Sequence, residues 1–277
     1  MGDIVFVDEY YLLVPSKEFS GHYSKSANEQ YIIAWSDGYV LEDEESGTQE
    51  WVAGSYILLE REKLVLRGTL ERPNSGVVAN DGSFVIIDQF FSDELASSLF
   101  VFSKLGQELI HHRFSANLAI ACISNNGQYV ICQLGSSDSA DSSAIAFFDS
   151  QKGLLLWQKV PETWVADTFE FDFENEKIYL VYENENKVKF QYSFRGEFLD
   201  AKAWYNFRIK HGNGFQVLEL ADKKFAEDLS TDKNLPNEAL ELYFLAAEKL
   251  VHYPYFCAKV HRKIGEIYAN ANEIEDA

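Results

Sequence analysis

Four copies of one short motif, a polar turn followed directly by an apolar run that contains an aromatic residue, constrain the fold more than any other feature of the sequence. The copies are Asn28–Ile33, Asn80–Val85, Asn125–Val130 and Glu174–Tyr179. Their aromatic residues recur at intervals of 45 to 53 residues. A repeat of this length that is made only of short strands indicates an all-β domain in which each copy builds one small sheet.

Each copy is predicted to form the first hairpin of a sheet, because a second apolar hairpin follows it. The second hairpins are 56–66, 99–109, 144–154 and 187–197. The residues at the same place in these four turns are Lys63, Gly106, Gly153 and Gly196. Glycine suits such a turn because it adopts a positive φ at no steric cost. Two hairpins per repeat give four-stranded sheets, which are the blades of a β-propeller.

The two ends of this region each contain a hairpin without a partner. Residues 4–14 resemble a second hairpin that lacks a first, and residues 207–218 resemble a first hairpin that lacks a second. Joined, they would complete a fifth blade and remove exposed sheet edges. We therefore predict a mainly β fold over residues 1–220, a β-propeller of about five blades closed by the N-terminal strands. Four blades with these segments as flanking strands are the alternative.

After about residue 221 the apolar pattern changes to a helical period, which predicts a helical segment over residues 221–277. Residues 237–250 form an amphipathic pattern with Pro236 in the first turn, and Pro254 ends it. A second helix is expected over residues 255–269, and residues 270–272 are expected to form a turn.

Both regions resemble known repeat families. The blade region resembles divergent WD40-like and quinoprotein-like β-propeller repeats in its repeat length and paired hairpins. The tail is similar to tetratricopeptide (TPR) repeats, and the matching positions are Ile264, Gly265 and Tyr268 in a first helix and Ala239, Tyr243 and Ala246 in the preceding second helix. Ala277 would open the next second helix. Because about three stacked repeats are needed for stability, this resemblance allows the chain to be a truncated piece of a longer protein. An ordinary docked helical hairpin is the alternative.

Charge and hydropathy narrow the range of partners. The net charge of −20 argues against nucleic acid, because phosphates would be repelled. The chain has no apolar run of about 18 residues, so a membrane is not expected as a partner either. The first residues, Met1–Phe6, lack the basic and then apolar layout of a signal peptide.

The cysteines favour a reducing compartment, and hence a cytoplasmic location. If Asn126–Gly127 is a two-residue hairpin turn, Cys122 lies opposite Ile131 and Cys132 lies opposite Ala121. The two thiols then point to opposite faces of the sheet and cannot bond easily. A third cysteine, Cys257, makes the count odd, which also fits a reducing compartment.

In a propeller the charged loops would sort onto two faces. Turns within hairpins carry mainly Lys and Arg, whereas loops between hairpins carry carboxylates on the opposite face. The candidates for an acidic rim that binds a partner are Asp43, Glu44, Glu45, Asp93, Glu94, Asp138, Asp141, Glu183 and Glu185. Such a rim would steer a basic protein or peptide toward it. Solvated loops without a partner are the alternative.

No group of residues predicts catalysis, a metal site or a cofactor. His111 and His112 are neighbours on a strand, so their rings point to opposite faces and cannot chelate one metal together. The serine- and aspartate-rich run at residues 136–143 lacks the ligand spacing of an EF-hand calcium loop.

Two functions follow from this pattern. We expect a non-catalytic scaffold or assembly module that binds a protein or peptide partner through the propeller face and the helices; its oligomeric state stays open. The alternative is a small-molecule or glycan-acting propeller enzyme or sensor. That alternative needs two carboxylates close together, and the candidates are Asp88, Glu170 and Asp172.

Overall fold

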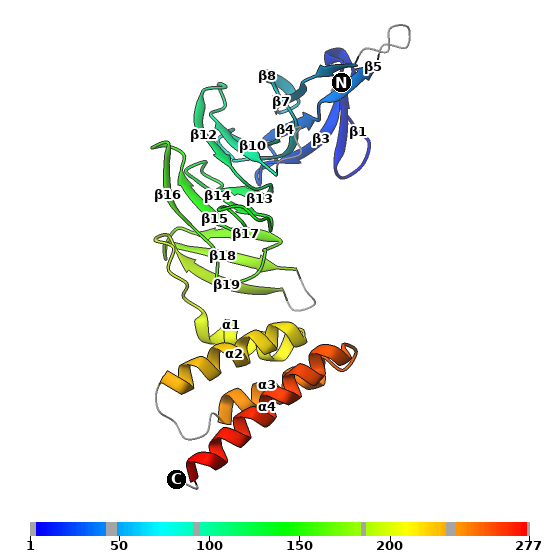
Figure 1. Ribbon diagram of the computed structural model, residues 1–277. Helices are drawn as coiled ribbons and strands as arrows, with labels where there is room; N and C mark the ends of the chain where they lie inside the picture. Colours follow the sequence, from blue (N-terminus) through cyan, green and yellow to red (C-terminus); the bar gives the residue numbers. More distant parts are fainter. Residues whose placement is uncertain (1–3, 43–48, 91–94, 184–186, 231–236, 276–277) are drawn as a thin grey trace. The chain divides into compact units, whose positions relative to one another are not determined.

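The computed structural model describes residues 4–42, 49–90, 95–183, 187–230 and 237–275 of the 277-residue chain. The chain divides into two compact units, Met1–Leu199 and Asp200–Ala277. The first unit is built of antiparallel strands, and the second contains four helices within the described ranges (Figure 1). None of these helices is both long and apolar enough to cross a membrane, as far as the described residues go. The predicted mainly β fold with C-terminal helices is confirmed.

The first sheet contains the N-terminal strands as well as the first copy of the repeated motif. Its strands, in spatial order, are β1 (Val5–Phe6), β2 (Tyr11–Val14), β3 (Phe19–Lys25), β4 (Tyr31–Ser36), β7 (Gly54–Glu60) and β8 (Lys63–Leu70). A 3-10 turn, η1 (Pro15–Lys17), joins β2 to β3. A separate hairpin, β5 (Tyr39–Glu42) and β6 (Gln49–Val52), lies between β4 and β7 in the chain.

Three further sheets follow along the chain, and in each the strands pair in sequence order. The second sheet consists of β9 (Pro73–Val78), β10 (Phe84–Gln89), β11 (Ser97–Phe102) and β12 (Glu108–Phe114). The third consists of β13 (Leu118–Ile123), β14 (Tyr129–Leu134), β15 (Ile145–Asp149) and β16 (Leu154–Lys159). The fourth consists of β17 (Thr168–Asp172), β18 (Lys177–Tyr182) and β19 (Val188–Ser193). The predicted first hairpin of each repeat is therefore present in all four sheets. The predicted second hairpin is present in the first three, whereas in residues 187–197 only β19 is a strand and a single bridge, Tyr192–Phe198, follows it.

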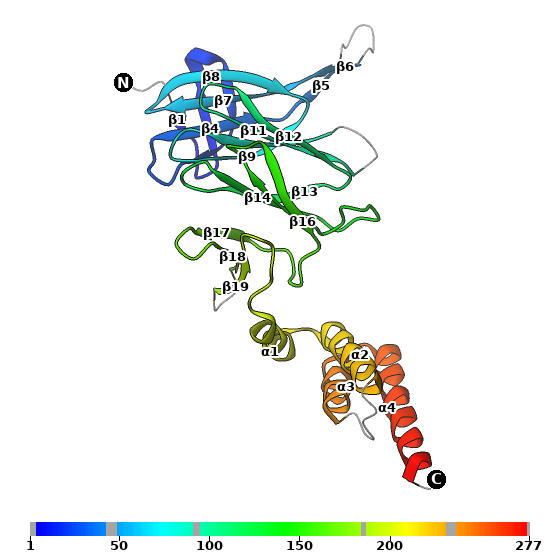
Figure 2. The same ribbon diagram turned by 90° about the vertical axis from the view of Figure 1, so that its left-hand side faces the viewer.

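Consecutive sheets pack against one another through apolar faces. Strand β9 contacts β4, β13 contacts β9 and β10, and β17 contacts β13. The first and second sheets share a core in which Leu58 and Phe84 are fully buried, and the second and third share one that contains Val101 and Val130. The result is a stack of sheets in chain order, with the first and fourth sheets at its two ends (Figure 2).

The predicted closure of a fifth blade by the N-terminal strands is wrong. Strand β2 pairs with β3 of the first sheet, in a register that places Leu12 opposite Gly21. Leu12 and Val14 are buried against the face of that sheet that carries Ile57 and Leu59. The N-terminal strands therefore cover the outer face of the first sheet, because its apolar residues would otherwise be exposed to water. We call this segment, residues 4–18, the N-terminal cap.

The other half of the predicted fifth blade is also wrong, because residues 207–218 are helical. They lie across α1 (Ala201–His211) and α2 (Gly214–Ser230). At the junction, the Asn213 side chain accepts a hydrogen bond from the Gln216 backbone N–H at 3.0 Å. In return, the Gln216 side chain accepts one from the Asn213 N–H at 2.8 Å. This reciprocal capping box starts a helix where the sequence suggested a hairpin turn.

The helical unit begins earlier and continues further than expected. Its first helix starts at Ala201, whereas the sequence predicted helices only from about residue 221. The predicted helix over residues 237–250 is confirmed as α3 (Asn237–Lys249). The second predicted helix is α4 (Pro254–Glu275), which runs through residues 270–272, so the turn expected there is wrong. Helices α2, α3 and α4 share an apolar core that includes Val217, Tyr243 and Val260.

Turn and register details test the sequence reading further. The pairs Cys122–Ile131 and Cys132–Ala121 are confirmed, and both thiols are free. Gly106, Gly153 and Gly196 have φ values of 80°, 64° and 82°, as their place in the turns predicted. Lys63 does not share this position, because it is the first residue of β8 and pairs with Glu60. The two residues between them, Arg61 and Glu62, have the positive φ values there.

The polar turns of the repeated motif touch one another from sheet to sheet. The Asn28 N–H donates to the Asn80 side-chain oxygen at 2.8 Å, and the Asn80 N–H donates to the Asn125 carbonyl at 2.9 Å. Within the turns, the Ser26 and Ser124 hydroxyls each donate to the Asn two residues later. Asn28 therefore serves both its own turn and the contact to a neighbouring sheet, whereas in the third copy Asn126 serves the turn and Asn125 the contact.

Candidate functional site

Most of the predicted acidic rim lies outside the described residues. This applies to Asp43, Glu44, Glu45, Asp93, Glu94 and Glu185. The structure places the other three, Asp138, Asp141 and Glu183. Asp138 and Asp141 lie together beside one pocket, whereas Glu183 is not among the residues that line it. The Glu183 backbone N–H instead donates to the Asp167 carboxylate at 2.7 Å.

The pocket beside Asp138 and Asp141 has a volume of about 640 Å³ and lies between the second and third sheets. Its remaining walls come from Leu95, Ala96, Arg113, Phe114, Ser115, Ser137 and Ser139. Asp138 is exposed, and the Arg113 guanidinium lies 4.7 Å from the centre of the Phe90 ring. The predicted acidic rim therefore includes the cation Arg113 beside Asp138 and Asp141 at this pocket.

Asp141 holds the pocket wall together. Its carboxylate accepts hydrogen bonds from the Ser115 N–H, the Ser115 hydroxyl and the Gln158 amide, all at 2.7 Å. Burial raises the pKa of Asp141, but the bonds from Ser115 and Gln158 outweigh it and leave the pKa below its ordinary value. Since Ser115 lies in the connection from β12 to β13 and Gln158 belongs to β16, Asp141 ties its own loop to that connection and to an outer strand of the third sheet. This is a structural role.

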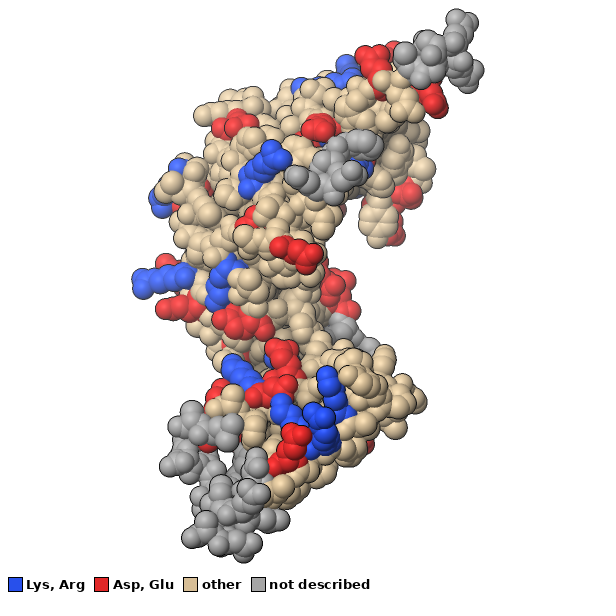
Figure 3. All heavy atoms as spheres, in the orientation of Figure 1, with Lys and Arg blue, Asp and Glu red and all other residues tan. Residues whose placement is uncertain are grey.

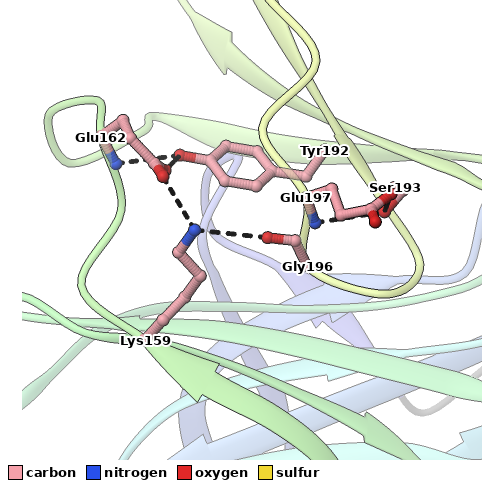
Figure 4. A network of polar contacts seen from close by, with 6 residues as sticks. All are labelled: Lys159, Glu162, Tyr192, Ser193, Gly196 and Glu197. Atoms are coloured by element: carbon pink, nitrogen blue, oxygen red, sulfur yellow. Dashed lines mark hydrogen bonds and ion pairs between the residues drawn. The ribbon is translucent and has the colours of Figure 1, made fainter. Parts of the chain in front are cut away.

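A second polar network, which no sequence motif indicated, joins the third and fourth sheets (Figure 4). Lys159 at the end of β16 pairs with Glu162 at 2.9 Å and donates to the Gly196 carbonyl at 3.3 Å. The Tyr192 hydroxyl of β19 donates to the Glu162 carboxylate at 2.8 Å and accepts from the Glu162 N–H at 3.0 Å. We call Lys159, Glu162, Tyr192 and Gly196 the sheet-joining network.

The sheet-joining network perturbs its two acidic groups in opposite directions. Burial raises the pKa of Glu162, but the bonds from Lys159 and Tyr192 outweigh it and leave the pKa below its ordinary value. The pKa of Tyr192 is raised, first by burial and then by its bond to the Glu162 carboxylate. Glu162 is therefore the charged partner and Tyr192 the neutral donor, which suits a structural link between two sheets.

The three carboxylates suggested for hydrolysis each have a local partner. Asp88 is buried and accepts from the Arg72 N–H, and burial raises its pKa despite that bond. Glu170 pairs with Lys189 at 2.6 Å, and Asp172 accepts from the Asn175 N–H and side-chain amide. Within the described ranges, no group of three or more His, Cys, Asp or Glu could hold a metal.

The helical unit contains a groove between two parallel helices. Phe215 near the start of α2 contacts Phe256 near the start of α4, with ring centres 4.9 Å apart. About two turns further along both helices, Asp222 of α2 pairs with Lys263 of α4. A groove of about 450 Å³ lies along this line, and its lining residues are Phe215, Leu218, Asp222, Phe256, Lys259, Val260, Arg262, Lys263 and Glu266. We call it the α2/α4 groove.

One end of the α2/α4 groove is aromatic. Phe215 packs edge-on against both Phe256 and Tyr253, and Tyr255 packs against Phe256, with ring centres 4.9 to 5.3 Å apart. These rings stay accessible, since Phe215 and Phe256 are each 39% exposed and Tyr255 is 68% exposed. Clustered, half-exposed aromatic side chains are the residue type that dominates binding energy in protein interfaces.

The cations of the groove lie beyond the aromatic rings along α4. Lys263 is held by Asp222 and lies 5.2 Å from the ring centre of Tyr243, while Arg262 pairs with Glu266 at 3.3 Å. Lys259 lies 5.4 Å from the ring centre of Tyr255. Lys and Arg side chains gather on the helical unit beside uncharged surface (Figure 3). The groove thus has an excess of positive charge in a chain whose net charge is −20.

The α2/α4 groove could not be predicted as long as residues 207–218 were expected to be strands. One signal could have found it, namely Asn213 followed three residues later by Gln216, which is a helix-start pattern. With α2 placed there, Phe215, Leu218 and Asp222 fall on one helix face at spacings of three and four residues.

Comparisons with known proteins do not identify a family. No family model matches the chain, and no curated protein matches it. Among solved structures, the chain is similar to hydrazine synthase from Kuenenia stuttgartiensis, with 11% sequence identity and a TM-score of 0.39. The similarity covers 62% of this chain and 48% of that chain, so it spans about half of the solved protein.

Proposed function

We propose that this chain is a non-catalytic interaction module that binds a protein or peptide partner in the α2/α4 groove. The observation that carries the proposal is the accessible aromatic cluster at the end of a groove of about 450 Å³ between two parallel helices. Grooves between parallel helices receive helical or extended segments of partners, because side chains of the partner can enter between the two rows of residues. This geometry supports a protein or peptide as the partner.

The architecture supports the same proposal. Four sheets stacked in chain order support a divergent, open β-propeller-like arrangement of blades in the first unit. In the second unit, contacts between α2 and α4 join residues 41 positions apart, which supports a helical repeat. This spacing is longer than the tetratricopeptide repeat of about 34 residues, so the likeness to that family rests on the helix-pair arrangement.

The free thiols of Cys122 and Cys132 support a reducing, cytoplasmic location.

The acidic rim keeps a smaller part in the proposal. Asp138 is exposed and is the described rim residue best placed to meet a basic partner segment. Asp141 is engaged with Ser115 and Gln158, so its loss would change the loop as well as any contact. A rim contact would steer the partner electrostatically and add little affinity by itself.

The proposal is tested by co-purification with a matched pair of variants. Phe256→Ser removes a half-exposed ring from the groove, and Phe244→Ser removes a ring of similar exposure, 47%, from α3 outside it. We expect proteins that co-purify with the full chain to be retained by Phe244→Ser and lost with Phe256→Ser. Loss in both variants, or in neither, would count against the α2/α4 groove as the binding site. Circular dichroism checks that both variants remain helical.

A further inference from the structure

We infer that the occupant of the α2/α4 groove is an acidic segment that carries an apolar side chain close to a carboxylate. The apolar side chain packs on the rings of Phe215 and Phe256, and the carboxylate pairs with Lys259. This inference rests on the proposed function and adds the chemistry of the partner to it.

The apolar part follows from the rings at the start of the two helices. Phe215 and Phe256 meet edge-on and each leaves 39% of its surface exposed, while Leu218 and Val260 continue the apolar lining along the groove. Covering accessible aromatic surface with a partner's apolar side chain removes it from water, which is the largest favourable contribution in most interfaces.

The acidic part follows from the different states of the three cations. Arg262 and Lys263 already pair with Glu266 and Asp222. Lys259 makes a cation–π contact with Tyr255, and within the described part of the chain it has no carboxylate within ion-pair distance. A ligand carboxylate can therefore pair with Lys259 without first breaking an existing ion pair. A ligand carboxylate that pairs with Arg262 or Lys263 would contribute less to the binding energy, because an existing ion pair is lost as the new one forms.

The distance between Phe256 and Lys259 sets the spacing of the ligand. Phe256 and Lys259 are three residues apart on α4, which corresponds to about 4.5 Å along the helix axis. An extended segment advances about 3.3 Å per residue. The apolar and acidic residues of the ligand should therefore be one or two positions apart in its sequence.

The net charge of the chain makes this surface selective. At −20 the protein repels acidic segments over most of its surface, and the excess of cations at the α2/α4 groove is a local exception. A basic segment would be disfavoured by like charge at Lys259, since Arg262 and Lys263 are already paired with Glu266 and Asp222 of the same groove. The groove therefore discriminates by sign as well as by shape.

An unbiased selection tests the inference. Random linear peptides displayed on phage are selected against the immobilised full chain, and the winning sequences are read. We expect Asp or Glu to be enriched one or two positions from Leu, Ile, Phe, Tyr or Trp. The winners, synthesised with a fluorescent label, should bind Lys259→Glu and Phe256→Ser at least about tenfold more weakly than the unchanged chain.

A matched control separates groove effects from net charge. Lys202→Glu makes the same charge change on an exposed residue of α1 that does not line the groove, and it should leave peptide affinity unchanged. Winners rich in Lys or Arg, winners without charge bias, or affinity that is unaffected by Lys259→Glu would overturn the inference. If co-purifying proteins are nevertheless lost with Phe256→Ser, the proposed function stands and only the ligand chemistry is wrong. If neither assay distinguishes Phe256→Ser, both fail.

Discussion

At the residue scale, side chains in turns and connections join one sheet to the next. The contacts among Asn28, Asn80 and Asn125 give the recurring turn a purpose that a single hairpin would not explain, since each bond crosses between sheets. Each such bond contributes about 1 kcal/mol when it replaces bonds to water. The sheet-joining network of Lys159, Glu162 and Tyr192 does the same between the third and fourth sheets with charged partners.

Glu162 makes the stability of the first unit depend on pH. Its pKa in the folded chain lies below the ordinary value of 4.5, so the carboxylate stabilises the fold above that value. The contribution is lost as the pH falls through the lowered pKa. We expect Glu162→Gln to lower the melting temperature at pH 7. The loss in the free energy of unfolding should be no more than about 1 kcal/mol, because the pair is partly exposed. The difference in melting temperature between this variant and the unchanged chain should shrink as the pH falls below the pKa of an ordinary glutamate.

Thermal melts at several pH values, followed by tryptophan fluorescence, measure this effect. Glu197→Gln is the surface control, because that side chain contacts Ser193 in its own turn and does not reach the third sheet. A gap between Glu162→Gln and the unchanged chain that stays constant down to pH 3 would show that the carboxylate charge is not what the network uses.

At the scale of the element, the start of α2 decides how the second unit folds. Asn213 and Gln216 satisfy each other's backbone N–H groups, two of the four that the start of a helix leaves without an intrahelical partner. Gly214 is needed there because a Cβ on it would lie 2.5 Å from the Leu250 side chain, which packs against this turn. The helix start and the core of the unit are therefore built at one place.

Replacing Asn213 by Ala should destabilise the helical unit by about 1 kcal/mol, the usual cost of losing an N-cap side chain. Urea unfolding followed by circular dichroism at the helical band measures it. The control is Asn206→Ala on the exposed side of α1, where Ala is the better helix former and stability should be unchanged or slightly higher. Equal effects of the two substitutions would mean that the capping box contributes nothing beyond helix propensity.

Elements with a strong period could be predicted from the sequence, and junctions could not. The hairpins at Asn80–Val85 and Asn125–Val130 were found because turn chemistry and alternation agree there, and the register of Cys122 followed from the turn alone. Residues 207–218 were misread because Phe207, Ile209 and Phe215 alternate with polar residues while Gly212 and Gly214 imitate a hairpin turn. The α2/α4 groove was lost with them, since it needs two helices that are distant in the chain.

At the scale of the whole molecule, the two end sheets of the first unit differ in how their surfaces meet water. The first sheet has an apolar outer face, which the N-terminal cap covers with Leu12 and Val14. The fourth sheet carries an exposed Glu170–Lys189 ion pair on one face, which can stay in water. A stack of sheets finished in this way does not need its ends to meet, which is why ring closure was a poor prediction from the motif count alone.

Removing the N-terminal cap should expose the apolar face of the first sheet. A chain that starts at Phe19 loses the burial of Leu12 and Val14, which together contribute about 3 kcal/mol or more. We expect a lower melting temperature, binding of the dye ANS, and self-association in light scattering. A chain that starts at Val7 is the control, because it keeps β2 with Leu12 and Val14. It loses the exposed Val5 and Phe6 and the partly buried Ile4, so its effect should be the smaller one.

If the chain that starts at Phe19 melts like the unchanged protein and binds no dye, then Ile57 and Leu59 are covered by something other than the cap. If both truncated chains bind the dye equally, β1 is as important as β2. Either result would remove the argument that the cap replaces ring closure.

The N-terminal cap also has a consequence for how the chain folds during synthesis. Because β2 pairs with β3, the strands of all four sheets pair in chain order, with only the β5–β6 hairpin inserted between β4 and β7 of the first sheet. Each sheet can therefore form as its residues leave the ribosome, in order from the first to the fourth. A ring closed by its first strands would have to keep them unpaired until synthesis of the last blade, and long-range pairing of that kind is slow and prone to aggregation.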